Sequence, residues 1–242
     1  MELSRRGAQD IVRNAAGRMH AGALMLLVQP LYILAELITA TAVIAPYSLV
    51  DNTISDLGAT TCTTIGYGVG PVAVCSPWHL LVNGAFIVFG LLMTVGAVLL
   101  RDWFPRARVS AAALVLWVVS GLSSIGTGLT PLDQALEVHV LVSLPVFLTQ
   151  PLALLLSGLA LRDRPGLAGS ALALGTISLA ATVAFFAVPA GGAFGGLLER
   201  LALWPGYVWL LGLGVVVLRD LSRPNQRAGT GTNERIQAAT SK

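Results

Sequence analysis

Long apolar stretches alternate with polar segments along the chain, and this alternation predicts its main structural elements. Each stretch is about 18–25 residues long, which is the length of helix that crosses the hydrocarbon core of a bilayer. Charged residues are confined to short clusters between the stretches. The pattern therefore predicts an all-α protein with six transmembrane helices, at residues 21–45, 79–100, 109–129, 138–161, 167–189 and 201–218.

The composition excludes a soluble domain of this length. Hydrophobic residues make up 55% of the 242 residues, charged residues make up 11%, and the mean hydropathy is +0.77. A soluble domain typically carries about 25% charged residues. The net charge of +3 could indicate a nucleic-acid partner, but the basic residues flank the predicted helices and form no patch. We therefore expect no nucleic-acid partner.

The basic residues predict the orientation in the membrane. Of the 15 Lys and Arg residues, all except Arg200 fall on segments that six helices would place on one side. By the positive-inside rule that side is cytoplasmic, so both termini are predicted to be cytoplasmic. The predicted layout is a cytoplasmic segment at 1–20, a transmembrane domain at 21–218 and a disordered cytoplasmic tail at 219–242. The Ala-, Leu- and Arg-rich usage indicates a bacterial plasma membrane.

The longest loop, at residues 46–78, is predicted to lie outside and contains no Lys or Arg. It carries both cysteines of the chain, Cys62 and Cys75. Two cysteines in one extracytoplasmic loop favour a disulfide over metal ligation. Such a bond would stabilise the loop by about 3 kcal/mol on the chain-entropy model.

Polar residues inside the predicted spans fall on single helix faces. They are Gln29, Tyr32, Glu36 and Thr39 in the first span, His79 and Asn83 in the second, Ser120, Ser123, Ser124 and Thr127 in the third, and His139, Ser143 and Gln150 in the fourth. Because polar groups that face lipid are penalised, spans one to four are predicted to share a polar interior. Alternatively, these residues only hold neighbouring helices together, by close packing and by hydrogen bonds across the interfaces. Glu36 must be protonated, paired or in contact with water.

Most acidic residues are predicted to gather at the outer membrane edge. Asp51, Asp56, Asp133, Glu137 and Glu199 fall there with His79, His139 and Arg200. Two kinds of chemistry remain open. A divalent metal could be held by Asp56, His79, Asp133 and His139 and polarise water, or a His–carboxylate pair could act as a general base without metal. Solvated helix ends would give the same pattern.

Three segments at the outer edge carry a family resemblance. They are Asn52–Gly58, Gly128–Asp133 with His139 downstream, and Gly196–Arg200. In these segments the chain resembles a bacterial six-span family known as domain of unknown function 998, and more distantly the damage-regulated autophagy modulator proteins. Thr130 replaces the aromatic residue expected before Pro131. The resemblance singles out Asn52, Ser55, Asp56, Asp133, His139, Glu199 and Arg200, and implies no particular reaction.

These observations predict a multi-pass membrane protein with an outward-facing polar site between the outer ends of spans one to four and six. The site is predicted to bind a lipid head group or another small amphiphile, with Arg200 holding an anionic group. Asp56, His79, Asp133 and His139 would shape the pocket or transfer protons, and no cofactor is required. Two alternatives are a metal- or His/Asp-dependent lipid-directed hydrolase and a proton-coupled transporter that uses Glu36.

Overall fold

The computed structural model describes residues 2–223, with side chains from Arg13 onward. Most of the predicted tail at 219–242 lies outside the described residues. The elements, in chain order, are α1 (Glu2–Leu27), α2 (Leu31–Thr41), the 3-10 turn η1 (Ser55–Gly58), β1 (Thr63–Tyr67), β2 (Gly70–Val74), α3 (His79–Leu99), α4 (Arg108–Leu129), α5 (Leu136–Ala160), α6 (Pro165–Ala187) and α7 (Gly195–Ser222).

Within the described residues, six helical segments are long and apolar enough to cross a membrane, which confirms the predicted number of spans. The first span, Arg13–Thr41, is made of α1 and α2 together and is not the continuous helix that the sequence predicted. Proline has no backbone N–H and its ring clashes with the preceding turn, so the helix breaks at Pro30. The last span is longer than predicted, because α7 already begins at Gly195.

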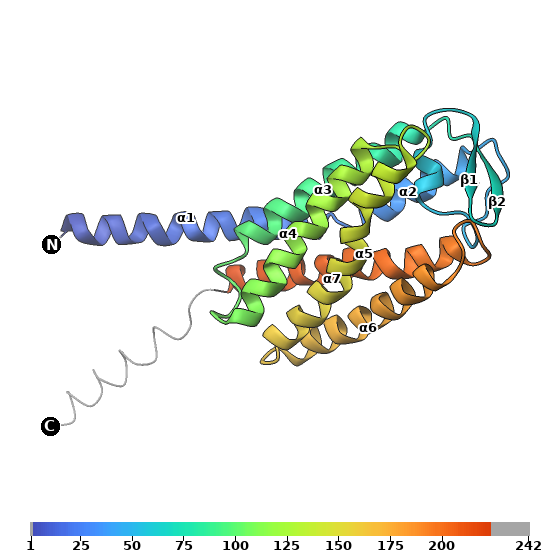
Figure 1. The fold of residues 1–242 in the computed structure, drawn as a ribbon. Coiled ribbons are helices and arrows are strands. Elements are labelled where there is room, and N and C mark those ends of the chain that lie inside the picture. The colour runs from blue at the N-terminus through green and yellow to red at the C-terminus, as the bar shows by residue number, and fades with distance from the viewer. Residues whose placement is uncertain (1, 224–242) are drawn as a thin grey trace, which may run out of the picture.

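The spans form a closed bundle (Figure 1). Each of α3, α4, α5, α6 and α7 packs against its neighbour in the chain, and α1 completes the ring by packing against α7 and α3. Glycines allow the closest approach, since a Cβ at Gly90 of α3 would lie only 2.6 Å from the carbonyl oxygen of Gly121 in α4. Inside the ring, Trp117 stacks on Trp209 with 5.9 Å between ring centroids.

The polar faces of the first four spans point inward but do not share one open interior. Ser124 of α4 donates to the carbonyl oxygen of Phe86 in α3 at 3.1 Å, and Ser123 donates to the carbonyl oxygen of Val142 in α5. Gln150 of α5 donates to the carbonyl oxygen of Leu203 in α7. These side chains donate to backbone carbonyl oxygens of neighbouring helices, which is the packing alternative.

The loop between α2 and α3 contains a two-stranded β-hairpin, so the prediction of an all-α fold is wrong at this point. β1 and β2 pair antiparallel, with Thr63 opposite Val74 and Tyr67 opposite Gly70. Gly70 adopts a φ of +128°, which glycine tolerates and other residues rarely do. The predicted disulfide between Cys62 and Cys75 is present and joins the two strands at their open end.

The hairpin lies at one end of the bundle, which we call the hairpin end. α1 begins and α7 ends at the opposite end (Figure 1). Because the first span begins and the last span ends at the same end of the bundle, the number of spans is even.

Candidate functional site

A buried ion pair fixes the loop that follows α2. Arg200 of α7 donates from Nε to Glu36 of α2 at 2.8 Å, and the two side chains are only 3% and 0% exposed. The other Glu36 oxygen accepts from the indole of Trp204 at 2.9 Å. The remaining Arg200 donors bind the hydroxyl of Tyr47 and the carbonyl oxygens of Leu49, Asn52 and Gly196.

This geometry changes two roles that the sequence indicated. The donors of Arg200 are bonded to acceptors of the chain itself, so its contacts give no support to the predicted role of holding an anionic group. Glu36 lies away from the cavity described below, with both oxygens bonded, which gives the transporter hypothesis no support. The sequence could not pair them, since they are 164 residues apart.

The segment Thr53–Asp56 is a rigid turn. The Asp56 carboxylate accepts from the Thr53 backbone N–H at 2.9 Å, and the Asp56 N–H is bonded to the Thr53 hydroxyl at 3.2 Å. These reciprocal bonds resemble a capping box. Tyr67 of β1 donates to the same carboxylate at 2.5 Å. Burial and the neighbouring Asp56 charge raise the pKa of the Tyr67 hydroxyl, so Tyr67 remains a donor.

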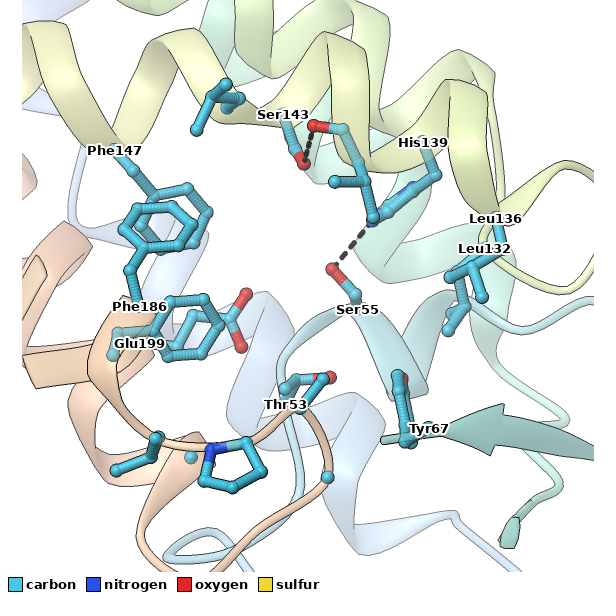
Figure 2. Close-up of a pocket in the computed structure, with 18 residues that line it drawn as sticks. Thr53, Ser55, Tyr67, Leu132, Leu136, His139, Ser143, Phe147, Phe186 and Glu199 are labelled. Carbon is cyan, nitrogen blue, oxygen red and sulfur yellow. Dashed lines mark hydrogen bonds between the residues drawn. The ribbon is translucent and has the colours of Figure 1, made fainter. Parts of the chain in front are cut away.

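Glu199 ties this turn to α7. Its carboxylate accepts from the backbone N–H of Ile54 at 2.6 Å. Glu199 is 3% exposed and faces the cavity described next (Figure 2).

Ser55 and His139 are bonded to each other at the centre of the site. His139 Nε2 lies 2.9 Å from Ser55 Oγ (Figure 2). Its other ring nitrogen, Nδ1, lies 2.6 Å from the carbonyl oxygen of Thr130. His139 comes from the first turn of α5, and Ser55 is the first residue of η1. The imidazole therefore links the loop after α4 to the turn after α2.

A cavity of about 380 Å³ lies beside this pair. Its polar end is formed by Thr53, Ser55, Tyr67, His139 and Glu199, and its body by apolar side chains of α5 and α6 that include Phe147, Phe185 and Phe186 (Figure 2). We call it the hairpin-end cavity. Ligand pockets of small molecules typically have volumes of about 300–1,000 Å³ and a few polar groups among apolar walls.

The rim of the hairpin-end cavity is exposed on the outside of the bundle. Val140 of α5 is 53% exposed and Phe186 of α6 is 50% exposed, and both line the cavity. Both lie within candidate membrane spans, near the hairpin-end termini of α5 and α6.

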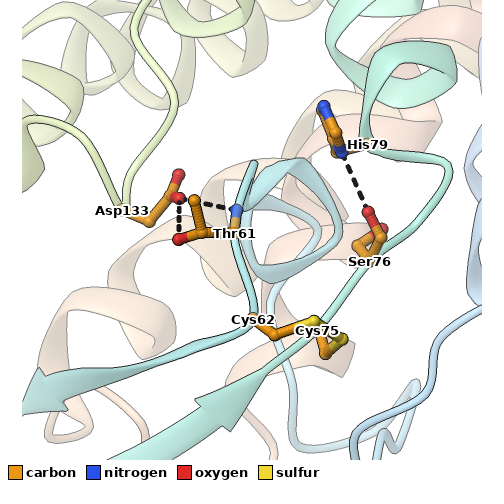
Figure 3. Close-up of a disulfide and its surroundings, with 6 residues drawn as sticks. All are labelled: Thr61, Cys62, Cys75, Ser76, His79 and Asp133. Carbon is orange, nitrogen blue, oxygen red and sulfur yellow. Dashed lines mark hydrogen bonds between the residues drawn. A yellow bond between two sulfur atoms is a disulfide. The ribbon is translucent and has the colours of Figure 1, made fainter.

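Asp133 and His79, two of the predicted site residues, lie away from the cavity. Asp133 accepts four hydrogen bonds at 2.9–3.0 Å, from the backbone N–H groups and hydroxyls of Thr60 and Thr61. Figure 3 shows the two bonds from Thr61. His79 is bonded through Nδ1 to the carbonyl oxygen of Ser76 at 3.0 Å. Among the described residues, no three His, Cys, Asp or Glu side chains are grouped as metal ligands. The structure therefore does not bring Asp56, His79, Asp133 and His139, the candidate metal ligands, together into one group.

A family comparison matches residues 26–216 to the family described as protein of unknown function DUF998. The chain belongs to the DUF998 family. Comparisons with curated proteins and with solved structures give no match. The three segments that carried the resemblance meet at the hairpin end of this DUF998 protein, through the Arg200–Asn52, Glu199–Ile54 and His139–Ser55 bonds.

The predicted site residues of this DUF998 protein fall into three groups. Ser55, His139 and Glu199 line the cavity. Asn52, Asp56 and Arg200 hold the loop behind it. Asp133 and His79 lie away from both, because Asp133 holds the base of the hairpin and His79 caps the turn before α3.

The sequence did not indicate the contribution of the fifth span. α6 supplies Phe185 and Phe186 to the cavity, and Val188 directly after it also lines the cavity, whereas the predicted site excluded this span and included spans one to four and six. The prediction relied on polar faces, and an apolar cavity wall carries none. The adjacent pair Phe185-Phe186 near the end of the span was the only available signal.

The hydrogen bonds by which Asp133 holds the base of the hairpin can be tested by measuring stability as a function of pH. Burial acts to raise the pKa of Asp133, but the hydrogen bonds from Thr60 and Thr61 outweigh it and lower this pKa. The bonds therefore contribute stability above the unfolded-state pKa of about 3.9, and this contribution is lost as the pH falls through the lower native pKa. We expect Asp133→Asn to cost about 1–2 kcal/mol at pH 7. The difference in melting temperature from wild type should shrink near pH 3, and a difference independent of pH would contradict this account.

Proposed function

We propose that this DUF998 protein binds an amphiphile that enters the hairpin-end cavity sideways from the bilayer. Its hydrocarbon chain would lie between α5 and α6, beside Phe147, Phe185 and Phe186, and its polar end would meet Ser55, His139 and Glu199. One observation carries this proposal: the cavity joins a polar end to an apolar body whose rim is exposed within two membrane spans.

We place the cavity in the extracytoplasmic leaflet of the plasma membrane. The disulfide at the hairpin end supports this placement, because such bonds persist in oxidising compartments. The basic turns between α3 and α4 and between α5 and α6, with Arg101, Arg106, Arg108, Arg162 and Arg164, fall at the other end of the bundle and support it independently.

The charges that line the cavity favour an uncharged or hydrogen-bond-donating head group over a phosphate. Glu199 is the acidic residue of the lining, and no Lys or Arg belongs to it among the described residues. Arg200 is close in sequence but is bonded to Glu36. A bound phosphate would therefore face a carboxyl group with no basic partner, which is unfavourable in a site of low dielectric. Hydroxyl or amide donors could instead bond to the Glu199 carboxyl.

Blocking the rim of the cavity should abolish binding. The probe is a single-chain monoacylglycerol with a photoactivatable diazirine at the end of its chain, added to the full-length protein in detergent micelles. Val140→Trp places a large ring in the rim and should reduce crosslinking at least tenfold. Leu141→Trp is the matched control, because Leu141 is the next residue, is 69% exposed and does not line the cavity.

The two variants should melt at the same temperature, since both positions face lipid. Equal crosslinking of Val140→Trp, Leu141→Trp and wild type would show that the probe samples the outside of the bundle, and would refute binding in the cavity. We expect the probe to crosslink to peptides from α5 and α6 in wild type. This crosslinking should be lost only in Val140→Trp.

A further inference from the structure

We propose that Ser55 and His139 act as nucleophile and general base on a carboxylic ester of a long-chain amphiphile bound in the hairpin-end cavity. This inference rests on the proposed binding function and adds a reaction to it. A serine hydroxyl within hydrogen-bond reach of an imidazole, which is in turn oriented by a third group, is the arrangement that activates serine.

The hydrogen-bond partners fix the tautomer of His139. The carbonyl oxygen of Thr130 can only accept, so Nδ1 carries the proton and donates to it at 2.6 Å. In the neutral ring, Nε2 is then an acceptor, and it faces Ser55 Oγ at 2.9 Å. The serine hydroxyl must therefore donate to the imidazole, which is the direction that general-base catalysis requires. The Thr130 carbonyl takes the orienting role that a carboxylate has in many serine hydrolases.

The surroundings hold this pair in place. The residue before Ser55 is tied to α7 through the Glu199 carboxylate, and the residue after it is tied to Tyr67 and Thr53. His139 is only 6% exposed, so its ring has little freedom. A nucleophile on a rigid turn and a base on a helix make a preorganised pair.

The cavity supplies access for the substrate. Ser55 and His139 both line it at the polar end, where the body leads towards the lipid. An amphiphile with its chain among the phenylalanines would place its ester group, which lies between chain and head group, at this end. Ser143, the one hydroxyl residue of this lining outside residues 53–67, is bonded to the carbonyl oxygen of Val140 and has no histidine partner.

The reaction balances with water as the only co-reactant. Ser55 Oγ forms a bond to the ester carbonyl carbon while its proton passes to His139 Nε2. The bond to the alcohol oxygen breaks, and His139 returns the proton to that leaving alcohol. Water then attacks the acyl–Ser55 ester, again with His139 as base, and releases the fatty acid and free Ser55.

A long-chain alkyl fluorophosphonate tests this pair directly, because it forms a stable bond to an activated serine with release of fluoride. Full-length protein in micelles should be labelled on Ser55, as read from peptide masses. Ser55→Ala should abolish labelling, and Ser170→Ala, at an exposed serine of α6 outside the cavity lining, should leave it unchanged. His139→Gln should slow labelling by about 10²–10⁴-fold. Hydrolysis of a 4-nitrophenyl ester of a long-chain fatty acid should likewise be abolished by Ser55→Ala and slowed by His139→Gln.

The photoactivatable monoacylglycerol separates the two proposals. Ser55→Ala should still be crosslinked by it, because the apolar body of the cavity is intact. Two results would overturn the inference and leave amphiphile binding standing. One is normal crosslinking of wild type with no fluorophosphonate label on Ser55, and the other is labelling that His139→Gln does not slow. Loss of crosslinking and labelling together in wild type would refute the binding function itself. Ser55→Ala removes one hydroxyl and should melt near wild type, which keeps the test independent of folding.

Discussion

Replacing Arg200 with leucine is expected to destabilise the protein by about 3–5 kcal/mol, which is the cost of removing one partner of a buried ion pair. Glu36 would be left inside the bundle without a countercharge, and the carbonyl oxygens of Leu49 and Asn52 would lose their donor. For a chain of this size the melting temperature should fall by on the order of 10 °C. Thermal unfolding in detergent micelles, followed by circular dichroism, measures this loss.

The Glu36→Gln variant is the matched control for this effect. It removes the charge of Glu36 but keeps a side chain that can bond to Arg200 and Trp204. The double variant Glu36→Gln/Arg200→Leu removes both charges of this pair, so it should be more stable than Arg200→Leu alone. If the two substitutions simply add their effects, or if Arg200→Leu costs less than about 1 kcal/mol, the ion pair does not hold the loop to the bundle.

Breaking the disulfide is expected to cost about 3 kcal/mol, by the loop-closure entropy that a bond between Cys62 and Cys75 removes from the unfolded chain. The hairpin carries Tyr67, which holds the Asp56 turn beside the cavity. We therefore expect the Cys62→Ser/Cys75→Ser variant to melt about 6–12 °C below wild type. Its crosslinking to the photoactivatable monoacylglycerol should also weaken.

A reductant distinguishes the disulfide from the side chains that were replaced. Dithiothreitol should lower the melting temperature of wild type towards that of the double serine variant and leave the variant unchanged. Identical melting of wild type with and without reductant, with free thiols shown by mass, would contradict a structural role for this bond.

The spans could be predicted from the sequence because the bilayer imposes a single length on each of them. Their number is confirmed, and the ends of α3, α4, α5 and α6 lie within two residues of the predicted ones. The first span was misjudged at Pro30, since apolar composition continues across the break. The last span was begun too late, because the charges of Glu199 and Arg200 looked like a helix boundary. Inside the bundle, Arg200 is neutralised by Glu36.

The site was predicted only in part, for a physical reason. His139 and Glu199 stood out because polar residues near a membrane are few, Ser55 stood out through the family resemblance, and all three line the cavity. Their pairing could not be predicted, since Ser55 and His139 are 84 residues apart and meet only through packing of the helices. Thr53 and Tyr67 were missed because both lie in a loop whose β-hairpin has no clear period in the sequence.

The most direct test of amphiphile binding is electron cryomicroscopy of the protein in nanodiscs of bacterial lipids, at a resolution that shows side chains. We predict elongated density between α5 and α6, with one end beside Phe147 and Phe186 and the other within hydrogen-bond distance of Ser55, His139 or Glu199. A map that resolves lipids around the bundle but shows the cavity filled by the protein's own side chains would contradict the account.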